Sequence, residues 1–454
     1  MLKSFAILTL GCKVNQYESQ QIRQFLESCG LRQVDASQQP QLVIVNTCCV
    51  THTASAKSRH FTHLAQKNHP EAVVICGCLP MVQTDELHAA GENVHVVKDR
   101  CDLTATLRCL VAAQATTPDA QSSRCFDPSI RAQNGDKVKS KNDLQQPDEL
   151  PSLTRFQGQT RAFLKIQDGC DASCSYCIIP TARPAVRFKK VEEILAEATA
   201  LVTAGHKEIV LTGVHLGAYG YQTARRRNWP DEENIHLPAL LDEVAQITNL
   251  ARIRLSSLDP ADVTARLMDV FAAHPNIMPH LHLSLQSGSN NILRRMARPY
   301  TADDFRAKIA LIRFRLDRPA ITTDIIVGFP GETDADFDQT VALAKEVAFA
   351  KMHVFVFSAR QGTPAARMQP KVPPEVKKRR SQVLRTLDET LQSQFRAQFL
   401  GETAQVLIET PAPRPAGRAE RYFMVQVVDG AHSLGDLVTV KLQENAREAA
   451  RGRT

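Results

Sequence analysis

The sequence predicts an α/β protein in three parts: an amino-terminal doubly wound parallel sheet, a central parallel β/α barrel and a small carboxy-terminal all-β barrel. Three observations support this order. Apolar, β-branched runs alternate with helical patterns over the first hundred residues, the alternation resumes for longer after a polar segment, and short strands separated by turns end the chain. A chain of 454 residues is also too long for one hydrophobic core.

The first part spans residues 1–112. The runs "SFAILTLGC", "QLVIVNTC" and "AVVICGC" are continuous and apolar, as in strands buried on both faces, and each ends at a cysteine. Between the first two lies a helical pattern from Gln16 to Cys29. Residues 113–155 are polar and without periodicity, which predicts a flexible linker or disordered insertion in which Cys125 has no role.

The second part, residues 156–393, repeats the β/α unit six times. The pattern fits a partial or complete parallel barrel, with an open doubly wound sheet as the alternative. One helix, "VEEILAEATALVTAG", ends at Gly205 as a glycine cap. In either architecture the ligand site lies at the carboxyl ends of the strands. The predicted strands are Ala162–Ile166, Glu208–Thr212, Arg252–Ser256, Leu281–Leu285, Ala320–Val327 and Met352–Phe357.

The third part, residues 394–454, contains "TAQVLIET", "RYFMVQVVDG" and "DLVTVKLQ", separated by "PAPRPAG" and "AHSLG". Such short strands predict a small barrel, which either binds RNA or only packs against its neighbour.

Composition narrows the class of protein. Hydrophobic residues make up 43% of the chain and charged residues 23%, as in soluble globular proteins. The apolar run at the start is too short for a signal peptide and no stretch could span a membrane, so we expect a cytoplasmic protein without a membrane partner. A net charge of +7 permits nucleic-acid binding without requiring it. Twelve cysteines in a reducing compartment predict metal ligands, catalytic groups or apolar core residues.

Cys170, Cys174 and Cys177 form a C-x3-C-x2-C loop directly after the first barrel strand. A structural zinc site normally has a fourth cysteine or histidine, and none stands nearby. A 4Fe–4S cluster held by three thiolates leaves one iron open to a chelating molecule. We therefore expect a cluster whose open iron binds the substrate or cofactor, the alternative being a zinc site completed from a distant residue.

Cys12, Cys48 and Cys78 each follow a strand of the first sheet. Carboxyl ends of parallel strands face one crevice, so these residues predict a second cluster site. Buried apolar cysteines are the alternative. Cys49 and Cys76 are not excluded as ligands by the pattern. Three further cysteines lie in helical stretches and are expected in the core: Cys29, Cys101 and Cys109.

The C-x3-C-x2-C loop resembles the signature of the radical S-adenosylmethionine (SAM) superfamily. The resemblance implies a 4Fe–4S cluster on these cysteines and one-electron cleavage of SAM to a 5′-deoxyadenosyl radical that abstracts hydrogen. Tyr176 occupies the aromatic position near the SAM adenine. "LTGVHLG", with Thr212 and Gly213, resembles the segment for the methionine amino group but lacks the usual acidic residue, and "DIIVGFPGET", with Gly328 and Glu332, resembles the strand flanking the adenosine.

The order of the three parts is similar to that of the methylthiotransferase family, whose amino-terminal cluster pattern is matched by Cys12, Cys48 and Cys78 and whose terminal β-domain is an RNA-binding TRAM domain. Further motifs that resemble the family are "TLGCKVNQYES", "RLSSLDP", "LHLSLQSGSNNILRRMARPYT" and "FSARQGTPAARM". The first is most similar to threonylcarbamoyladenosine tRNA methylthiotransferases of the MtaB type. Two departures are Pro184, where glycine is more common, and Asp259, where glutamate is usual.

The resemblance implies addition of a methylthio group to carbon 2 of threonylcarbamoyladenosine at tRNA position 37. It implies two 4Fe–4S clusters, two SAM molecules, and an electron donor such as flavodoxin or ferredoxin, while no catalytic acid or base is assigned. The anticodon stem-loop is the expected partner, since its bases can be splayed out. Basic segments that could bind its phosphates are "ARRRNW", "VKKRRSQ" and "ENAREAARGRT".

Four alternatives remain open from the sequence. Two lie within the family: the same reaction on isopentenyladenosine of tRNA, and methylthiolation of an aspartate on a ribosomal protein. The other two belong to different classes, a non-catalytic iron–sulfur RNA-binding protein and a zinc-stabilised α/β protein.

Overall fold

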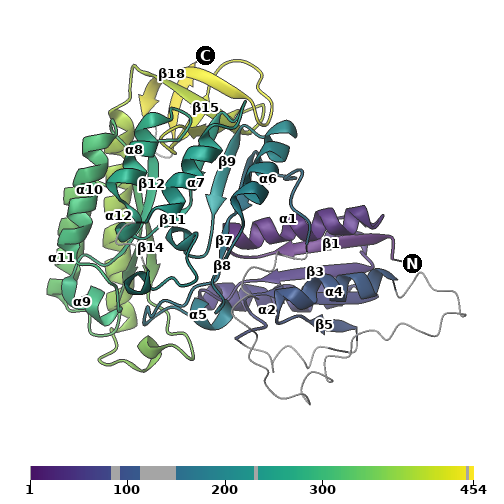
Figure 1. Cartoon of the computed structure of the whole chain (residues 1–454). Coiled ribbons are helices and arrows are strands. Elements are labelled where there is room, and N and C mark those ends of the chain that lie inside the picture. The colour runs from purple at the N-terminus through teal and green to yellow at the C-terminus, as the bar shows by residue number, and fades with distance from the viewer. Residues whose placement is uncertain are drawn as a thin grey trace, which may run out of the picture. The chain divides into compact units, whose positions relative to one another are not determined.

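The computed structural model describes residues 2–82, 91, 93–112, 150–229, 234–445 and 449–453. Most of the predicted linker, with Cys125, lies outside these residues. The chain forms two compact units (Figure 1), Met1–Leu153 with Ile178–Lys189, and Thr154–Cys177 with Lys190–Thr454. The division at residues 112, 155 and 393 stays a prediction, because contacts group the carboxy-terminal barrel with the central sheet. Within the described part of the chain, no helix combines the length and apolar character needed to cross a membrane.

The first unit is a doubly wound parallel sheet in the order β2-β1-β3-β4-β5, as predicted. Alternate residues of its central strand enter two separate cores, Leu42 and Ile44 on one face, Val43 and Val45 on the other. Helices thus cover both faces. Its elements are β1 (Ser4–Thr9), α1 (Lys13–Ser28), β2 (Arg32–Gln33), η1 (Ala36–Gln38), β3 (Leu42–Thr47), α2 (His52–Lys67), β4 (Ala72–Gly77), β5 (Val94–Val96), α4 (Arg100–Ala112), α5 (Ile179–Ala182) and β8 (Arg187–Phe188).

The second unit contains the predicted six-stranded parallel sheet. Strands pair in the orders β6-β9-β10 and β11-β12-β13-β14. Because β11 begins only two residues after the end of β10, the two sets of strands are continuous and form one partial barrel. All six predicted strands are confirmed to within a residue or two. They are β6 (Arg161–Lys165), β9 (Glu208–Thr212), β10 (Arg252–Leu255), β12 (His280–Gln286), β13 (Ala320–Val327) and β14 (Lys351–Val356). Two further short strands, β7 (Gln167–Asp168) and β11 (Ser257–Leu258), were not predicted.

Helices follow these strands, and several begin at a strong cap. Thr301 and Thr333 start α10 and α11, each in a reciprocal capping box with an aspartate three residues later. The predicted helix before Gly205 is α6, and Gly205 has a φ of +99° as its cap requires. The helical elements are α6 (Val191–Thr203), η4 (Leu216–Ala218), η5 (Arg226–Asn228), α7 (His236–Ala245), η6 (Pro260–Asp262), α8 (Ala265–Ala273), α9 (Asn290–Arg295), α10 (Ala302–Arg315), α11 (Asp334–Val347), η7 (Pro364–Arg367) and α12 (Pro374–Ala397).

The carboxy-terminal strands close into a barrel in the order β15-β16-β17-β19-β18. The small barrel was predicted, but β16 and β19 were not recognised, since β16 starts inside the proline-rich "PAPRPAG" segment. Gly417 in β16 faces the carbonyl of Leu407 so closely that a Cβ would lie 1.8 Å from that oxygen. The strands are β15 (Thr403–Thr410), β16 (Ala416–Ala419), β17 (Met424–Val427), β18 (Leu437–Asn445) and β19 (Ala450–Arg453).

Candidate active site

The C-x3-C-x2-C loop starts just after β6 and β7, at the carboxyl end of the barrel sheet. Gln167 holds its beginning in place. The Gln167 amide donates to the carbonyls of Asp168 at 2.9 Å and Gly169 at 2.8 Å, and its oxygen accepts from the backbone N–H of His215 at 2.8 Å. This side chain fits only because residue 213 is glycine, where a Cβ would lie 2.9 Å from the Gln167 oxygen.

The end of the loop is fixed to other elements of the same unit. Ser175 donates its N–H to the carbonyl of Met296 at 3.0 Å and its hydroxyl to that of Arg295 at 2.8 Å. Tyr176 packs against an apolar cluster that includes Phe329, and burial raises the pKa of its hydroxyl well above the usual value. The aromatic ring predicted to lie near the SAM adenine is therefore held rigidly beside Cys177.

The three thiols of this loop have different surroundings. Burial raises the pKa of Cys170 to about 12, while the backbone N–H of Ala172 donates to its sulfur at 3.4 Å. Cys174 accepts a hydrogen bond at 3.2 Å from the guanidinium of Arg298, which forms an ion pair with Asp259. Asp259, one of the two departures from the family pattern, thus still supplies a carboxylate that orients an arginine.

The remaining residues predicted to contact SAM lie at the ends of two strands. Thr212 is buried at the end of β9, and its carbonyl accepts from the N–H of Ile166 at 2.9 Å. At the end of β13, one carboxylate oxygen of Glu332 accepts from the N–H of Gly328 and from Arg380, each at 2.6 Å. Burial raises the pKa of Glu332 despite these contacts. This carboxylate shapes the turn; contact of these residues with SAM stays a prediction.

The amino-terminal cysteines meet in the first unit, at the ends of β1, β3 and β4. Cys12 precedes α1, and a Cβ on Gly11 would lie 3.0 Å from the sulfur of Cys48. The charge of Cys78 raises the pKa of Cys12, and the charges of Cys78 and Cys12 raise that of Cys48, so the three thiols lie within electrostatic reach of one another. Burial is the larger cause for Cys48 and raises its pKa to about 11, whereas Cys12 is exposed at the start of α1.

Arg183 contacts this group from the segment that follows Cys177 in the chain. Its Nε donates to the sulfur of Cys78 at 3.3 Å, and its two terminal nitrogens hold Glu18 at 2.8 and 2.9 Å. A hydrogen bond from Cys49 and then the charge of Arg183 lower the pKa of Cys78 to about 6, against the cost of burial. The sequence analysis assigned no role to Arg183, Arg298 or Gln167, because each also has a partner at least 48 residues away in the chain.

Of the other cysteines, buried Cys49 forms a hydrogen bond with Cys78, whereas Cys76 lies in a different core. Cys76 packs in the core on one face of the sheet and Cys78 in the core on the other, because Gly77 has a φ of +90° and breaks the regular alternation. The expectation that Cys29 is a core residue is wrong: it ends α1 and is exposed. Cys109 is half-buried, and the side chain of Cys101 lies outside the described part of the structure.

Neither cysteine group is contracted around a single ion. A zinc ion with bonds of about 2.3 Å holds its thiolates about 4 Å apart. Over the described residues, the one group of histidine, cysteine or acidic side chains whose donor atoms all lie within 4.8 Å of one another is His282, Asp324 and His353. Three soft ligands with wider spacing suit a polynuclear cluster, which for the amino-terminal group stays a prediction.

Comparisons with known proteins agree with this architecture. The radical SAM superfamily model matches residues 164–344, and that of the uncharacterized protein family UPF0004 matches residues 4–99. In fold, the chain resembles the radical SAM methyltransferase TsrM from Kitasatospora setae, with a TM-score of 0.56, 15% identity, and coverage of 81% of this chain and 77% of that one.

Similarity to curated proteins extends over nearly the whole chain. Threonylcarbamoyladenosine tRNA methylthiotransferase MtaB of Bacillus subtilis is 33% identical over 97% of this chain and 94% of that protein. Its namesake in Chlamydia pneumoniae is 34% identical over 99% and 97%. The tRNA-2-methylthio-N(6)-dimethylallyladenosine synthase of Desulfitobacterium hafniense is 32% identical over 97% and 95%. The chain therefore belongs to the radical SAM tRNA methylthiotransferase family.

Proposed function

We propose that this enzyme attaches a methylthio group to carbon 2 of threonylcarbamoyladenosine at position 37 of tRNA. The observation that carries the proposal is the pair of cysteine groups, Cys170–Cys174–Cys177 and Cys12–Cys48–Cys78, in which one thiol of each accepts a hydrogen bond from an arginine paired with a carboxylate. Relatives named for this substrate match nearly the full chain, which supports the choice of base.

The first group would hold the SAM-binding 4Fe–4S cluster that the superfamily implies, and the second an auxiliary 4Fe–4S cluster. When bound, these groups supply one-electron cleavage of SAM and the sulfur chemistry, respectively. The chain's own residues orient them: Gln167 and Ser175 fix the loop, while Arg298 and Arg183 each supply a buried positive charge beside a thiolate. Carbon 2 of adenine is not nucleophilic, so ordinary methyl transfer would not suffice.

The anticodon stem-loop would contact exposed cations of the second unit. Arg227 in η5 and Lys378 on α12 are exposed. Two neighbouring arginines have structural partners instead: Arg226 pairs with Asp262, and Arg380 is buried with Glu332. We place the reaction in the cytoplasm, with flavodoxin or ferredoxin as the electron donor.

The first experiment counts iron and sulfide in anaerobically reconstituted protein. The wild type should hold about eight irons and a Cys12→Ala, Cys48→Ala, Cys78→Ala variant about four. Four irons in both, after complete reconstitution, would contradict an auxiliary cluster and with it the sulfur chemistry.

Mass spectrometry of tRNA nucleosides then identifies the base. A strain lacking the enzyme should lose the methylthio derivative of threonylcarbamoyladenosine, and a plasmid copy should restore it. The second candidate substrate is dimethylallyladenosine (the isopentenyladenosine of the alternative above), because the synthase from D. hafniense is almost as similar. Loss of that methylthio derivative instead would support the second candidate and overturn the first.

A further inference from the structure

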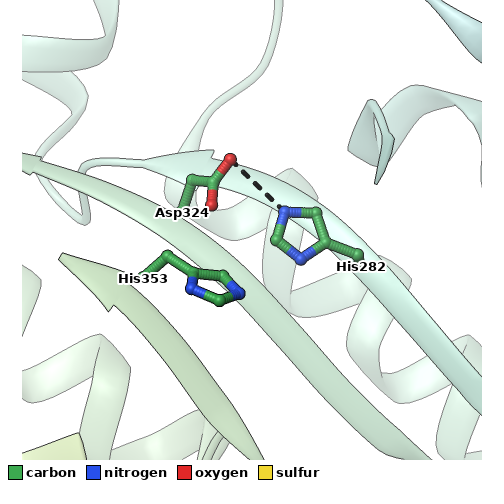
Figure 2. A group of neighbouring side chains, drawn as sticks. All are labelled: His282, Asp324 and His353. Carbon is green, nitrogen blue, oxygen red and sulfur yellow. Dashed lines mark ion pairs between the residues drawn. The ribbon is translucent and has the colours of Figure 1, made fainter. Parts of the chain in front are cut away.

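Three polar side chains meet on neighbouring strands of the barrel sheet, apart from the cysteine loop (Figure 2). His282 on β12 points toward Asp324 on β13, with 3.3 Å between its Nε2 and the carboxylate. His353 on β14 lies beside Asp324 in register, and its ring centre is 5.7 Å from that of His282. We call His282, Asp324 and His353 the His–Asp–His triad.

The triad lies on the side of the sheet that the helices leave uncovered. In β13 the buried residues Ile325 and Val327 alternate with half-buried Asp324 and Ile326. In β14, buried Met352 and Val354 flank exposed His353 on a strand against which α12 packs. In a parallel β/α barrel the uncovered side of the sheet faces the interior, and the active site lies at the carboxyl ends of the strands.

The position of the triad along the barrel axis places it close to the cysteine loop. Ile326 is two residues beyond Asp324 on the same face, or about 7 Å along the strand. Ile326 packs against the cluster that includes Tyr176, the neighbour of Cys177. At the other end, His280 stacks on Tyr422 of the small barrel with ring centres 4.2 Å apart. The triad therefore lies between the end of the sheet that carries the cysteine loop and the end that contacts the small barrel.

The chemistry of the triad suits a polar ligand with both donors and acceptors. Asp324 accepts hydrogen bonds, and imidazoles donate or accept according to tautomer. The hydroxyl of Thr322 lies 3.0 Å from Nδ1 of His282, so the ring is held with Nε2 toward Asp324. The threonylcarbamoyl group carries a carboxylate, a hydroxyl and urea N–H groups, whereas a dimethylallyl group carries none of these.

We propose that the His–Asp–His triad binds the polar substituent on N6 of threonylcarbamoyladenosine, with His353 facing its carboxylate and Asp324 accepting from its urea N–H. The inference rests on the proposed function. Carbon 6, which bears N6, is separated from the reacting carbon 2 by a single ring nitrogen, so the substituent must lie in the same chamber. An apolar substituent would offer these three side chains no hydrogen-bonding atoms and would displace water from them, so the triad should favour a polar substituent.

The test compares binding of two RNAs, an anticodon stem-loop with threonylcarbamoyladenosine and the same stem-loop with adenosine, to the reconstituted enzyme. Wild type should prefer the modified RNA, and His353→Phe and Asp324→Asn should each reduce that preference about tenfold while iron content stays unchanged. The matched control is His274→Phe. His274 ends α8 and forms another histidine–aspartate pair, with 2.6 Å between its Nε2 and the carboxylate of Asp242. This substitution should leave the preference intact.

Other results distinguish failure of the triad assignment from failure of the proposed function. Wild-type conversion of the modified tRNA with full preference in both triad variants would overturn the triad assignment alone. No conversion by the wild type would overturn the proposed function. Stoichiometric zinc in the wild type that disappears in His353→Phe would make the triad a metal site and overturn the assignment.

Discussion

Arg298 and Arg183 occupy equivalent positions beside the two cysteine groups. Each donates an N–H to one sulfur, Cys174 at 3.2 Å and Cys78 at 3.3 Å. Each is also paired with a buried carboxylate, so the guanidinium is oriented before any cofactor binds. Hydrogen bonds to ligand sulfurs are among the factors that set the potential of an iron–sulfur cluster.

Replacing Arg298 with methionine should therefore lower the reduction potential of the cluster on the C-x3-C-x2-C loop. The guanidinium stabilises the reduced, more negative state more than the oxidised one. A difference of about 1.4 kcal/mol between the two states corresponds to about 59 mV for one electron. The measurement is an EPR redox titration in the background lacking Cys12, Cys48 and Cys78, so that a single cluster is observed.

Arg294→Met is the control for this titration, because Arg294 is exposed on α9, the short helix that ends three residues before Arg298. Its potential should equal that of the parent. An unchanged potential in Arg298→Met would show that the contact with Cys174 is not retained once the cluster is bound.

Among the secondary-structure elements, the turn that ends β4 decides where Cys78 lies. Gly77 has a φ of +90°, and a Cβ there would come within 2.4 Å of the carbonyl oxygen of Thr47. The backbone of Thr47 cannot move aside as a flexible side chain could, so Gly77→Ala should displace Cys78. Iron content should fall by about half, with the remaining cluster still able to bind SAM.

Gly30→Ala separates conformation from crowding in this experiment. Gly30 also has a positive φ, +85°, but no atom lies within 4 Å of the added Cβ. The substitution should cost about 1–2 kcal/mol of stability and leave iron content unchanged. Equal iron loss in both variants would mean that destabilisation, rather than the position of Cys78, removes the cluster.

The strands were predictable and the connections between distant residues were not. β3 is a continuous apolar run because both faces are buried, and β13 is eight residues long with a glycine turn after it, so local pattern identifies both. Spacing and strand ends singled out the six cysteines, whose role as cluster ligands stays a prediction. The pairing of Arg183 with Glu18 joins residues 165 positions apart, and no local pattern encodes it.

The small barrel joins the barrel sheet through a buried ionic network within the second unit. Glu208 pairs with Arg254 at 2.9 Å and Arg252 at 3.6 Å, and all three side chains are almost fully buried. These arginines in turn donate to backbone carbonyls of Arg418 and Ala419 on β16. The carboxylate thus compensates charges that bind the small barrel to the sheet.

Glu208→Gln should destabilise the second unit by roughly 3–5 kcal/mol, because it leaves buried arginine charge uncompensated. Chemical denaturation measures the loss, and hydrogen exchange should accelerate in β16.

The effect of Glu208 should also depend on pH. Burial raises the pKa of Glu208, but the charges of Arg254, Arg161 and Arg252 lower it by a larger amount, so the net shift is downward. Its stabilisation is then complete above about pH 4.3, the unfolded value, and is lost as pH falls toward the folded pKa. The difference between wild type and variant should shrink in acid. Glu346→Gln, at an exposed pair with Arg306, should change little, and equal effects of both substitutions would contradict a role for burial.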